Sequence, residues 1–563
     1  MIQLPADSFE PGSQLPGRLA DAVSAWSAQD PDPDTRGELA SLLDQIATGS
    51  RESLDELTDA FHGRLQFGTA GLRGAIGAGP NRMNRVVVGQ AAAGLAAYLL
   101  DQGLAGGTVI IGHDARHKSD VFARDSAEIF AGAGFRALLV PVPTPTPVVA
   151  FGIGHFGCVA GVVVTASHNP PQDNGYKVYL GDGSQIVPPA DAEIAARIDD
   201  VTHRDLSDLP RSGDYSELGD ELGEAYLARI TSLVPPEAPR DLDWVYTPMH
   251  GVGGAVVAES VARAGFTGAL VVAEQAAPDP DFPTVGFPNP EEPGAIDLAL
   301  ALAQRTGVDL VVANDPDADR CAIAAPIDGV WRMLRGDELG ALLGDDALRR
   351  GVEGTYACSI VSSSLLAAMA AAHGQPFAAT LTGFKWIGRV PGLAFGYEEA
   401  IGYCVDPQAV PDKDGISALI RVLTLAAGLK AEGRTVADRL DEVAMTYGVY
   451  ETDQLSVRVE DLTLIEAAMS RLRTQPPATL IGQPLQVIDL ADGSDELPAT
   501  DAVLLAGEHV TIVVRPSGTE PKLKCYLEAR VPLAESVDLA SDRRRARGML
   551  AELRGEMSSS LGL

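Results

Sequence analysis

The sequence contains few cysteines, and they form no motif. Its five cysteines are scattered, without the CxxC spacing of a metal site or a redox pair. Most of them lie in apolar, strand-like runs, so we expect reduced thiols in the core of a cytoplasmic protein. They are Cys158, Cys321, Cys358, Cys404 and Cys525.

The sequence also lacks an excess of positive charge. Its formal net charge is −34 at pH 7, which favours solubility and argues against nucleic acid or an anionic membrane as a partner. An anionic substrate would need a local basic cleft to draw it against this overall field. With 46% hydrophobic and 21% charged residues the composition is ordinary for a globular protein. The 563 residues predict about three to five domains.

No apolar run is long enough to cross a membrane. The longest, Val86 to Leu100, is interrupted by two glycines and Gln90 and predicts a packed helix. The first residues form neither a basic nor an apolar segment, so we expect no signal peptide. The chain up to about Ala60 is acidic and helix-like, and carries little recognisable chemistry.

The most informative stretch is Thr165–Pro171, which reads TASHNPP. It follows the apolar run Cys158–Val164, which predicts a buried strand. Two prolines exclude an immediate helix, so Ser167 is expected on a loop at the carboxyl end of that strand, where open α/β sheets bind ligands. The Asn174-Gly175 pair then predicts a tight turn, and the strand after it would bring Lys177 back beside Ser167.

Ser167 does not fit an ordinary hydrolase. In the elbow pattern Gly-x-Ser-x-Gly, Thr165 and Asn169 stand in the glycine positions. His168 is a poor candidate for its base, because neighbouring side chains on extended backbone point to opposite faces. A polar loop after a core strand remains the alternative on this stretch alone.

A second motif, Asn314–Arg320, follows the apolar strand Leu310–Ala313. Its carboxylates at i, i+2 and i+4 can converge on a cation if the backbone is extended. They belong to Asp315, Asp317 and Asp319. An EF-hand loop is excluded by Arg320 and Pro326, which occupy its glycine and glutamate positions. Carboxylate oxygens suit Mg²⁺ better than zinc, and a solvated acidic turn is the alternative.

Several further loops could hold an anionic, hydroxylated ligand. One is a glycine-rich loop with Arg73, which is followed along the chain by a strand and loop with Arg116. Another is Val510–Lys522, which predicts a strand and then a loop that binds an anion, or else a plain hairpin. Two glycine-bounded loops read LTGFKWIG and FGYEEAIGY, and Asp412-Lys413-Asp414-Gly415 precedes an apolar helix. The proline-rich stretch Ala276–Gly294 is long enough to be functional. By contrast, Asp243–Gly254 lacks the third glycine of a dinucleotide fold, so NAD binding is not expected.

In their order, these motifs resemble the α-D-phosphohexomutase family of phosphoglucomutases and phosphomannomutases, over nearly all of Phe67–Leu527. The two glycine-bounded loops resemble its longer, phosphoglucomutase-2-like branch. The resemblance implies three related α/β domains and a smaller C-terminal α+β domain around a central cleft. We expect domain 1, with the helical extension and the serine, in residues 1–212. Domain 2 with the metal loop would span 213–326, domain 3 with the sugar loops 327–446, and domain 4 with the phosphate loop 447–563.

The resemblance also implies a reaction and its residues: interconversion of hexose 1-phosphate and 6-phosphate through phosphoserine 167 and a bisphosphorylated intermediate. Lys177 is the favoured proton-transfer group, with His168 as the other candidate and Arg73 stabilising charge. One Mg²⁺ per chain would bind the three aspartates and the Ser167 phosphate, and a glucose 1,6-bisphosphate-type molecule would activate the enzyme. The expected substrate-binding residues are Thr382, Gly383, Lys385, Glu398, Glu399, Lys413, Arg515, Ser517, Gly518, Thr519, Lys522, Arg320 and Arg116.

One position departs from the family pattern. Hexose-specific relatives carry Gly-Glu-x-Ser in the sugar loop, whereas here Ala400 replaces the serine after Glu398. Loss of a hydroxyl anchor predicts relaxed discrimination, best on glucose phosphate with some mannose or pentose turnover. A phosphopentomutase, a phosphatase and a non-catalytic phosphosugar-binding protein are the alternatives. The chain is expected to be a cytoplasmic monomer or homodimer.

Overall fold

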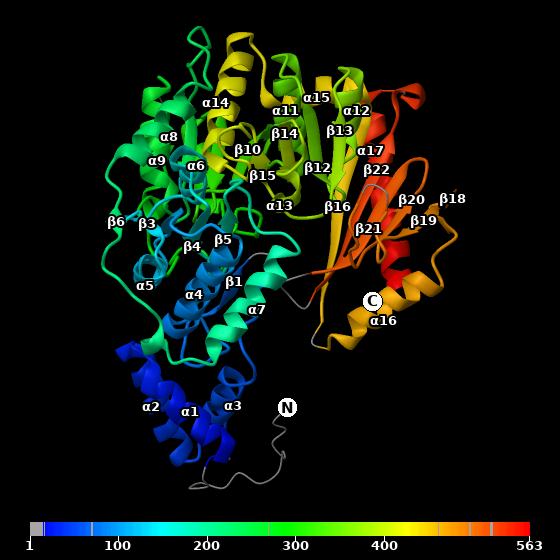
Figure 1. The fold of residues 1–563 in the computed structure, drawn as a ribbon. Helices are drawn as coiled ribbons and strands as arrows, with labels where there is room; N and C mark the ends of the chain where they lie inside the picture. The colour runs from blue at the N-terminus through cyan, green and yellow to red at the C-terminus, as the bar shows by residue number, and fades with distance from the viewer. Residues whose placement is uncertain are drawn as a thin grey trace. The chain divides into compact units, whose positions relative to one another are not determined.

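Figure 1 shows a computed structural model of the chain, which describes residues 15–562 apart from 16, 69–70, 268, 460, 495–496, 518–521 and 537. The chain divides into two compact units. Unit 1 comprises Met1–Pro235, Asp243–Cys321 and Gln408–Ile416, and unit 2 comprises Pro236–Leu242, Ala322–Pro407 and Ser417–Leu563. None of the helices in the described part of the chain combines the length and the apolar character needed to cross a bilayer.

Unit 1 begins with three helices, α1 (Gly17–Gln29), α2 (Pro33–Ala47) and α3 (Arg51–Ala60), which lie together in Figure 1. Asp32 and Ser50 cap α2 and α3, because each side chain accepts a hydrogen bond from a backbone N–H of the first turn. Each helix buries an apolar face that contributes to the core, including Trp26, Leu39 and Leu57. The helical character predicted for this segment is confirmed for the described residues.

The first sheet has the strand order β1-β5-β4-β2-β3-β6. Strands β4, β2, β3 and β6 are parallel, whereas β5 runs antiparallel to β4 and β1 antiparallel to β5. The strands are β1 (Leu72–Ala75), β2 (Thr108–His113), β3 (Arg136–Leu139), β4 (Ala160–Val164), β5 (Asp173–Leu180) and β6 (Ser216–Glu217). The helices are α4 (Arg85–Asp101), α5 (Ser119–Gly132), α6 (Thr146–Phe156), α7 (Ala190–Thr202) and the 3₁₀ turn η1 (Leu206–Asp208).

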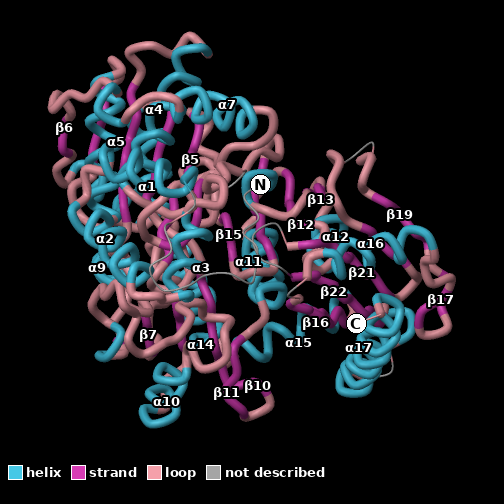
Figure 2. The backbone as a smooth tube through the Cα atoms, turned by 90° about the horizontal axis from the view of Figure 1, so that it is seen from below, coloured by secondary structure: helices cyan, strands magenta, loops and turns pink. Residues whose placement is uncertain are grey.

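The central strands β2 and β4 are buried on both faces, which explains their unbroken apolar runs. Ile111 and Val162 share a core with Phe122 of α5. Ile110 instead faces α6, where a Cβ added to Gly152 would lie 2.6 Å from its side chain. Figure 2 shows the strands running between helices. Both strands deliver the loops that follow them to one edge of the sheet.

The turn predicted at Asn174-Gly175 is wrong. Both residues lie in β5, opposite Gly74 and Arg73 of β1. The chain reverses earlier, in the turns of residues 167–172. The sequence concealed this because β1 is short and distant in the chain. The returning strand with Lys177 is confirmed, since Lys177 pairs with Val163 of β4.

Two other segments have clear outcomes. Helix α4 confirms the helix predicted over Val86–Leu100. The alternation of Pro with Val or Thr over Pro141–Pro147 predicts a stiff connector before the Ser167 strand, but this prediction is wrong for the last two residues, because α6 begins at Thr146. Pro147 fits the first turn of a helix, where its missing N–H loses no hydrogen bond.

The second sheet contributes three parallel strands to unit 1, with β7 between β8 and β9. These are β7 (Trp244–Thr247), β8 (Ala269–Val271) and β9 (Leu310–Asn314), accompanied by α8 (Glu221–Thr231), α9 (Gly253–Arg263), η2 (Ala273–Gln275) and α10 (Asp297–Thr306). The strand predicted over Leu310–Ala313 is confirmed as β9. Residues 276–294 form a loop of turns and bends without regular structure.

Unit 2 contains a hairpin and a four-stranded sheet of order β13-β12-β14-β15. The hairpin consists of β10 (Cys321–Ile327), which enters from unit 1, and β11 (Val330–Met333). The sheet strands are β12 (Thr355–Ser359), β13 (Phe377–Thr380), β14 (Leu393–Glu398) and β15 (Gly402–Cys404). The helices are α11 (Gly336–Arg349), α12 (Leu365–Ala372), α13 (Phe384–Ile387), α14 (Gly415–Ala431) and α15 (Val436–Tyr447).

The last part of unit 2 is an antiparallel sheet of order β16-β22-β21-β20-β19, with a separate β17–β18 hairpin. The strands are β16 (Val449–Arg458), β17 (Thr479–Leu480), β18 (Gln483–Pro484), β19 (Gln486–Asp489), β20 (Val503–Ala506), β21 (Val510–Pro516) and β22 (Lys522–Val531). Helices α16 (Thr463–Thr474), η3 (Leu533–Glu535) and α17 (Leu539–Leu561) complete it. The strand–loop–strand predicted around Arg515 is confirmed by the pairing of β21 with β22.

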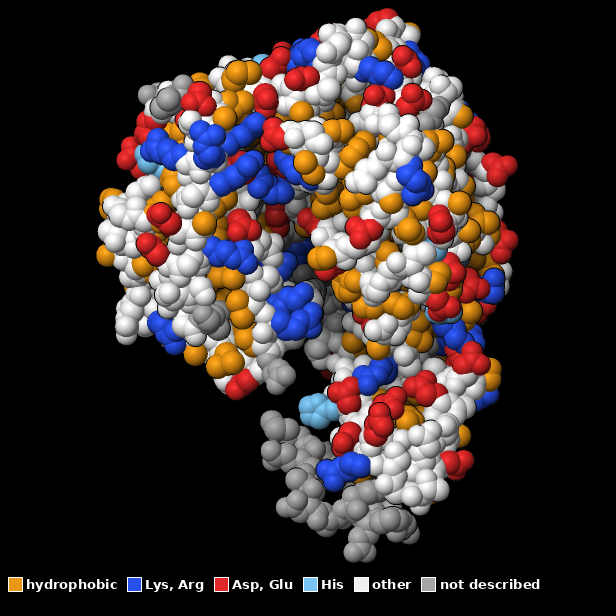
Figure 3. All heavy atoms as spheres, turned by 180° about the vertical axis from the view of Figure 1, so that it is seen from behind, with side chains coloured by type: hydrophobic (Ala, Val, Ile, Leu, Met, Phe, Trp, Pro, Cys, Tyr) orange, Lys and Arg blue, Asp and Glu red, His pale blue; other side chains and the backbone are white. Residues whose placement is uncertain are grey.

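Composition and structure agree on two points. All five cysteines are buried and free, as predicted for core thiols. On the face shown in Figure 3, acidic side chains are widespread, and Lys and Arg side chains gather in groups.

Candidate active site

Ser167 lies in the loop between β4 and β5, at the carboxyl end of β4. Its φ is +52°, so the backbone turns sharply there, and the Thr165 hydroxyl accepts the Ser167 N–H at 2.9 Å. The buried Arg116, in the loop after the neighbouring strand β2, fixes the main chain of this segment. Its guanidinium donates at 2.6–3.1 Å to the carbonyl oxygens of Ser167, Asn169, Pro170 and Asp173.

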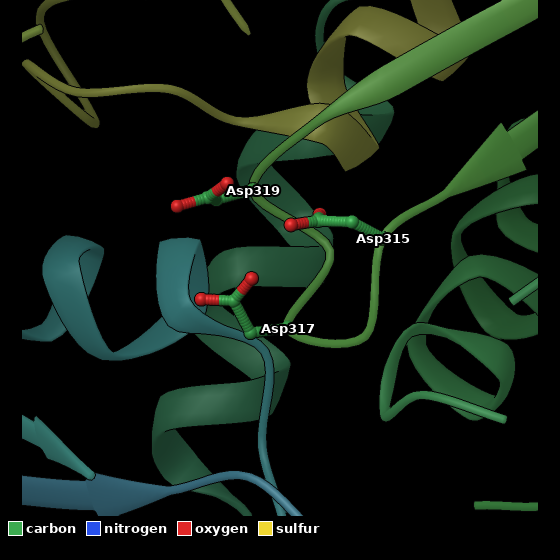
Figure 4. Close-up of side chains that lie close together, drawn as sticks. All are labelled: Asp315, Asp317 and Asp319. Atoms are coloured by element: carbon green, nitrogen blue, oxygen red, sulfur yellow. The ribbon is translucent and has the colours of Figure 1, made fainter. Parts of the chain in front are cut away.

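The three aspartates follow β9 in the same unit. All are buried, and one carboxylate oxygen from each lies within 4.8 Å of the others. Figure 4 shows Asp315, Asp317 and Asp319 turned toward one another around their loop. The predicted convergence is confirmed, but the predicted reason is wrong. Residues 316–318 form a turn, with Ala318 at φ +57°, instead of an extended strand.

The Ser167 side chain contacts the triad formed by these three aspartates. The Ser167 hydroxyl donates a hydrogen bond of 2.8 Å to Oδ2 of Asp315. Ser167 follows β4 and Asp315 follows β9, which belong to two different sheets. Each residue lies at the carboxyl end of its strand, where α/β sheets bind ligands. A serine hydroxyl thus lies directly beside a cluster of carboxylates.

The described donor set fits a divalent cation. Oδ1 of Asp317 and Oδ1 of Asp319 are buried and accept no hydrogen bond from any described residue. Burial and the two neighbouring carboxylates raise the pKa of Asp315 well above its ordinary value. A divalent cation would give these oxygens a partner and remove the repulsion between like charges. The buried triad can therefore hold a metal ion.

Lys177 of β5 reaches the same carboxylates. Its Nζ donates to Asp317 at 2.6 Å and to Asp319 at 2.8 Å. Burial by itself would lower the pKa of the Lys177 amine, but the carboxylates of Asp317 and Asp319 outweigh that effect and raise it. The predicted meeting of Lys177 with the Ser167 centre is confirmed, and in this arrangement the amine carries its proton.

His168 lies closer to Ser167 than we expected. Its Nδ1 is 3.2 Å from the Ser167 hydroxyl. The expectation that the two side chains diverge is wrong, because Ser167 is not on extended backbone. Burial, followed by the charges of Arg320 and Arg73, lowers the pKa of His168 well below its ordinary value. His168 is therefore a neutral imidazole beside the serine.

Three more predicted site residues surround this centre in unit 1. Arg73 lies on β1, not in a loop, and donates to the Asn169 side chain at 3.1 Å. The Arg320 N–H donates to Asp315 at 3.0 Å. The Lys413 amine lies 3.5 Å from Asp319. Cationic groups are thus concentrated around the serine in an otherwise strongly acidic chain.

The predicted sugar loops belong to unit 2 and are shorter than expected. Lys385 lies in the single turn of α13, and Glu398 is the last residue of β14. Only residues 399–401 connect β14 with β15. Thr382 and Gly383 precede α13, and the Thr382 hydroxyl is buried without a hydrogen-bond partner among the described residues.

Glu399 begins the connection between β14 and β15 and has a displaced pKa. Its carboxylate accepts hydrogen bonds from Ser359 at 3.1 Å and Ser362 at 3.4 Å. Burial and the neighbouring charge of Glu398 raise the pKa of Glu399 to about 7. This carboxyl group therefore titrates near neutral pH.

The predicted phosphate loop also belongs to unit 2. Arg515 lies near the end of β21, and the Ser517 N–H donates to the Lys522 carbonyl at 2.8 Å, which closes the loop. Gly518 and Thr519 lie outside the described residues. The β21–β22 pairing places the other three residues at the same end of this sheet.

Models of four domains match the chain in order: "Phosphoglucomutase/phosphomannomutase, alpha/beta/alpha" domains I, II and III at residues 64–205, 224–327 and 335–447, and the C-terminal domain at 457–546. The chain belongs to the phosphoglucomutase/phosphomannomutase family. The four-domain architecture expected from the motifs is thereby confirmed.

Relatives within this family carry different names. A Haemophilus influenzae protein named "Probable phosphomannomutase" is 50% identical over 80% of this chain and 93% of its own. The human phosphopentomutase is 35% identical over 92% of both chains. A Staphylococcus aureus phosphoglucomutase is 31% identical over 86% of this chain and 92% of its own. These relatives are mutases, and the protein is an isomerase.

A solved structure shows the same fold. Parafusin, a phosphoglucomutase from Paramecium in its open form, superposes with a TM-score of 0.68 and 19% identity, over 89% of this chain and 96% of its own. Family membership, with relatives named as mutases along most of the chain, sets aside the alternative of a non-catalytic binding protein.

Some residues of this phosphoglucomutase/phosphomannomutase-family centre lie in segments whose sequence does not mark them. The Thr146 hydroxyl donates to Asp317 at 2.6 Å, but a threonine in a proline-rich stretch gave no signal. The Arg116 guanidinium carbon lies over the Phe282 ring, 5.0 Å from the ring centroid. The Phe287 ring lies 6.0 Å from that of His168. Both aromatic residues belong to the loop 276–294, whose length was the only indication.

Proposed function

We propose that this enzyme interconverts the 1-phosphate and 6-phosphate of a hexose, with glucose phosphate preferred, through a phosphoserine at Ser167. The observation that carries this proposal is the Ser167 hydroxyl bonded at 2.8 Å to Asp315 within the buried triad. A serine that merely completed a polar loop would have no reason to face three buried carboxylates.

The reaction balances as two transfers. The bond between phosphorus and the Ser167 oxygen breaks while a bond forms from phosphorus to the free sugar hydroxyl, whose proton leaves to the enzyme. The bisphosphorylated sugar then turns around. Its other phosphate returns to Ser167, and the sugar oxygen that is released takes a proton back. A glucose 1,6-bisphosphate-type molecule would restore the phosphate on any Ser167 that has lost it.

We assign proton transfer to Lys177, whose amine contacts Asp317 and Asp319 beside the serine. These two carboxylates raise the pKa of the amine. A divalent cation on the triad would offset their charge, and burial would then favour the neutral amine that accepts the proton. His168, at 3.2 Å from the Ser167 hydroxyl, is the other candidate. Arg73 and Arg320 remain charged and balance the phosphate charge. Lys177→Met and His168→Ala variants separate the two candidates, because loss of the proton-transfer group lowers turnover more than it changes KM.

The carboxylates of Asp315, Asp317 and Asp319 would hold one Mg²⁺ together with the Ser167 phosphate. When bound, Mg²⁺ neutralises charge that develops on the transferring group, which is the largest contribution in this type of chemistry.

The receptor loop with Arg515, Ser517 and Lys522 would hold the phosphate that is not reacting. Each charge-assisted hydrogen bond contributes about 1.5–3 kcal/mol, so three or four contribute roughly 5–10 kcal/mol before ordering costs. Binding dominated by phosphate lets the sugar enter in two orientations, which a mutase requires. The sugar hydroxyls would contact the residues around Thr382, Lys385, Glu398 and Glu399, with Gly383 allowing close approach, and Lys413 would face the transferring phosphate.

A pentose phosphate is the second candidate substrate. The human relative, 35% identical along 92% of the chain, is named a phosphopentomutase. Ala400 supplies no hydroxyl where hexose-specific enzymes have serine, which weakens selection for a hexose.

The experiment is a mutase assay with the 1-phosphates of glucose, mannose, ribose and N-acetylglucosamine, with the matching bisphosphate and Mg²⁺ present. We expect the highest kcat/KM for glucose 1-phosphate and detectable mannose or ribose turnover. A kcat/KM for ribose 1-phosphate above that for glucose would replace the hexose proposal with the pentose one. Release of inorganic phosphate without isomerised sugar would indicate a phosphatase.

A further inference from the structure

Helices α1–α3 precede residue 64, where the match to the family begins. Nevertheless, they contact two segments of unit 1 that contain or follow an arginine of the active site. One segment is the loop 114–118 with Arg116. The other is the connection 76–84, which follows β1 and its Arg73.

The first contact is an ion pair. Lys118, the last residue of the loop, extends its amine to Asp32, at 3.0 Å, and to Asp34 at the start of α2. Asp32 is nearly enclosed, with a side chain only 6% exposed. It is also the N-cap of α2, so its orientation is fixed by the helix that it begins. A partly buried pair anchored in this way holds its geometry better than a surface pair does.

The neighbouring Asp30 strengthens this anchor. It is buried and accepts hydrogen bonds from the Thr35 hydroxyl at 2.6 Å and from the Asp32 N–H at 2.9 Å. The amino end of α2 is therefore a rigid support for Lys118.

Lys118 itself has an uncommon backbone. Its φ is +64°, a left-handed conformation that a residue other than glycine adopts only where its surroundings hold it. It occupies the N-cap position of α5 without making a side-chain cap. Instead, its side chain is committed to α2. The ion pair thus holds the point where the arginine loop turns into α5.

Arg116 lies two residues before Lys118 and transmits this constraint. Within the loop, Asp114 accepts hydrogen bonds from the Arg116 N–H at 3.0 Å and from the Ser119 hydroxyl at 2.7 Å. The Arg116 guanidinium then binds four carbonyl oxygens of the serine loop, among them that of Ser167 at 2.7 Å. The contacts form a continuous path from α2 to the main chain of Ser167.

The second contact supports the other arginine segment. The Glu38 carboxylate of α2 accepts the Ala78 N–H at 3.2 Å. At the end of α3, the Ala60 carbonyl accepts the Asn81 N–H at 3.0 Å. A Cβ on Gly79 would lie 2.6 Å from that carbonyl oxygen, so the two segments are in close contact.

We propose that helices α1–α3 form a positioning element of the active site. Through the ion pair of Lys118 with Asp32 and Asp34, they set the Arg116 loop, and through it the main chain that presents Ser167. Lys118 is thus a positioning residue that contacts neither substrate nor reacting atoms. This inference rests on the proposed function only where it predicts an effect on mutase turnover.

The structural test is hydrogen–deuterium exchange of the backbone amides of residues 166–173 in the full-length chain. Lys118→Met removes the ammonium group and should raise exchange in this segment. Lys118→Arg keeps the charge and should restore protection. The matched control is Arg197→Met, which removes an exposed guanidinium paired with Asp101 at 2.6 Å and Asp200 at 3.0 Å in the same unit, and should leave residues 166–173 unchanged.

The kinetic test uses the same variants with glucose 1-phosphate. Lys118→Met should lower kcat about tenfold with little change in KM, because a slightly misplaced nucleophile slows transfer without weakening phosphate binding. Lys118→Arg should recover most of the loss. Asp34→Asn, whose carboxylate is 73% exposed, should give a smaller loss that does not add to that of Lys118→Met.

The outcomes separate the two proposals. Unchanged exchange at 166–173 in Lys118→Met would overturn the positioning role, as would exchange raised equally throughout unit 1. If the wild-type enzyme has no mutase activity but Lys118→Met still raises amide exchange in residues 166–173, the proposed function fails and the positioning role stands.

Discussion

The Ser167 hydroxyl donates a 2.8 Å hydrogen bond to Asp315, although 148 positions separate the two residues in the chain. The bond joins the loop after β4 to the turn after β9. It places a serine hydroxyl in a cluster of buried carboxylates, of which Asp317 and Asp319 each have one oxygen without a hydrogen-bond donor among the described residues. Changes on either side of this bond should therefore affect the same chemical step.

Asp317→Asn should lower turnover by about 100- to 1000-fold, because it removes a charge that would hold the cation at the transferring group. Excess EDTA should abolish the mutase activity of the wild-type enzyme, and added Mg²⁺ should restore that activity. Asp55→Asn, which removes an exposed carboxylate paired with Arg51, is the control and should be fully active. Full wild-type activity in excess EDTA would contradict the metal site.

Arg515→Ala should weaken binding of the sugar phosphate by roughly 2–4 kcal/mol, because it removes a charge-assisted pair from the receptor loop. The measurement is KM for glucose 1-phosphate, compared with Arg554→Ala, which removes an exposed guanidinium on α17. If both variants keep the wild-type KM and kcat, the non-reacting phosphate binds elsewhere.

Ala400→Ser should narrow the substrate range toward hexoses. The added hydroxyl could hold one sugar hydroxyl that the wild-type loop leaves without a partner, and such polar anchors discriminate strongly. The measurement is the ratio of kcat/KM for glucose and ribose 1-phosphates in both forms. An unchanged ratio would mean that Ala400 does not set specificity.

Glu399 predicts a pH dependence of stability. Its pKa is raised from 4.5 to about 7 by burial and by Glu398, so the folded chain retains a proton that the unfolded chain releases. Its contribution to stability is therefore complete below about pH 4.5 and is lost as the pH rises through 7. Relative to Glu399→Gln, the wild type should lose about 1–3 kcal/mol of unfolding free energy over this range.

Denaturant titrations of both forms at pH 4.5, 6 and 8 provide the measurement. Parallel pH profiles for the wild type and Glu399→Gln would show that this carboxyl group titrates at its ordinary pKa. Glu292→Gln, an exposed carboxylate in unit 1, is the control and should follow the wild type.

The sequence predicted those parts of the molecule that depend on local patterns. Strands β4 and β9 were evident because both of their faces are buried, and α4 because its run was long and apolar. The Asn174-Gly175 turn was wrong because the pairing of β5 with β1 overrides local turn preference. No local pattern reports such a partner.

The site was predicted in its residue types but not in its contacts. The aspartates converge through a turn at Ala318, which alternation on a strand could not reveal. His168 faces Ser167 only because the Ser167 backbone adopts a left-handed conformation. The role of Arg116 as a clamp on four carbonyl oxygens, and that of Thr146 on Asp317, depend on tertiary structure and leave no mark in the sequence.

The most direct test of the central claim is peptide mass spectrometry of residues 165–177 from the purified enzyme, before and after incubation with excess glucose 1-phosphate and Mg²⁺. The account predicts phosphate on Ser167 at the start and its loss to the sugar as bisphosphate forms. The Ser167→Ala variant should carry no phosphate on this peptide and show no turnover. An active wild-type enzyme whose Ser167 carries no phosphate at any stage, or a Ser167→Ala variant with near-normal turnover, would contradict it.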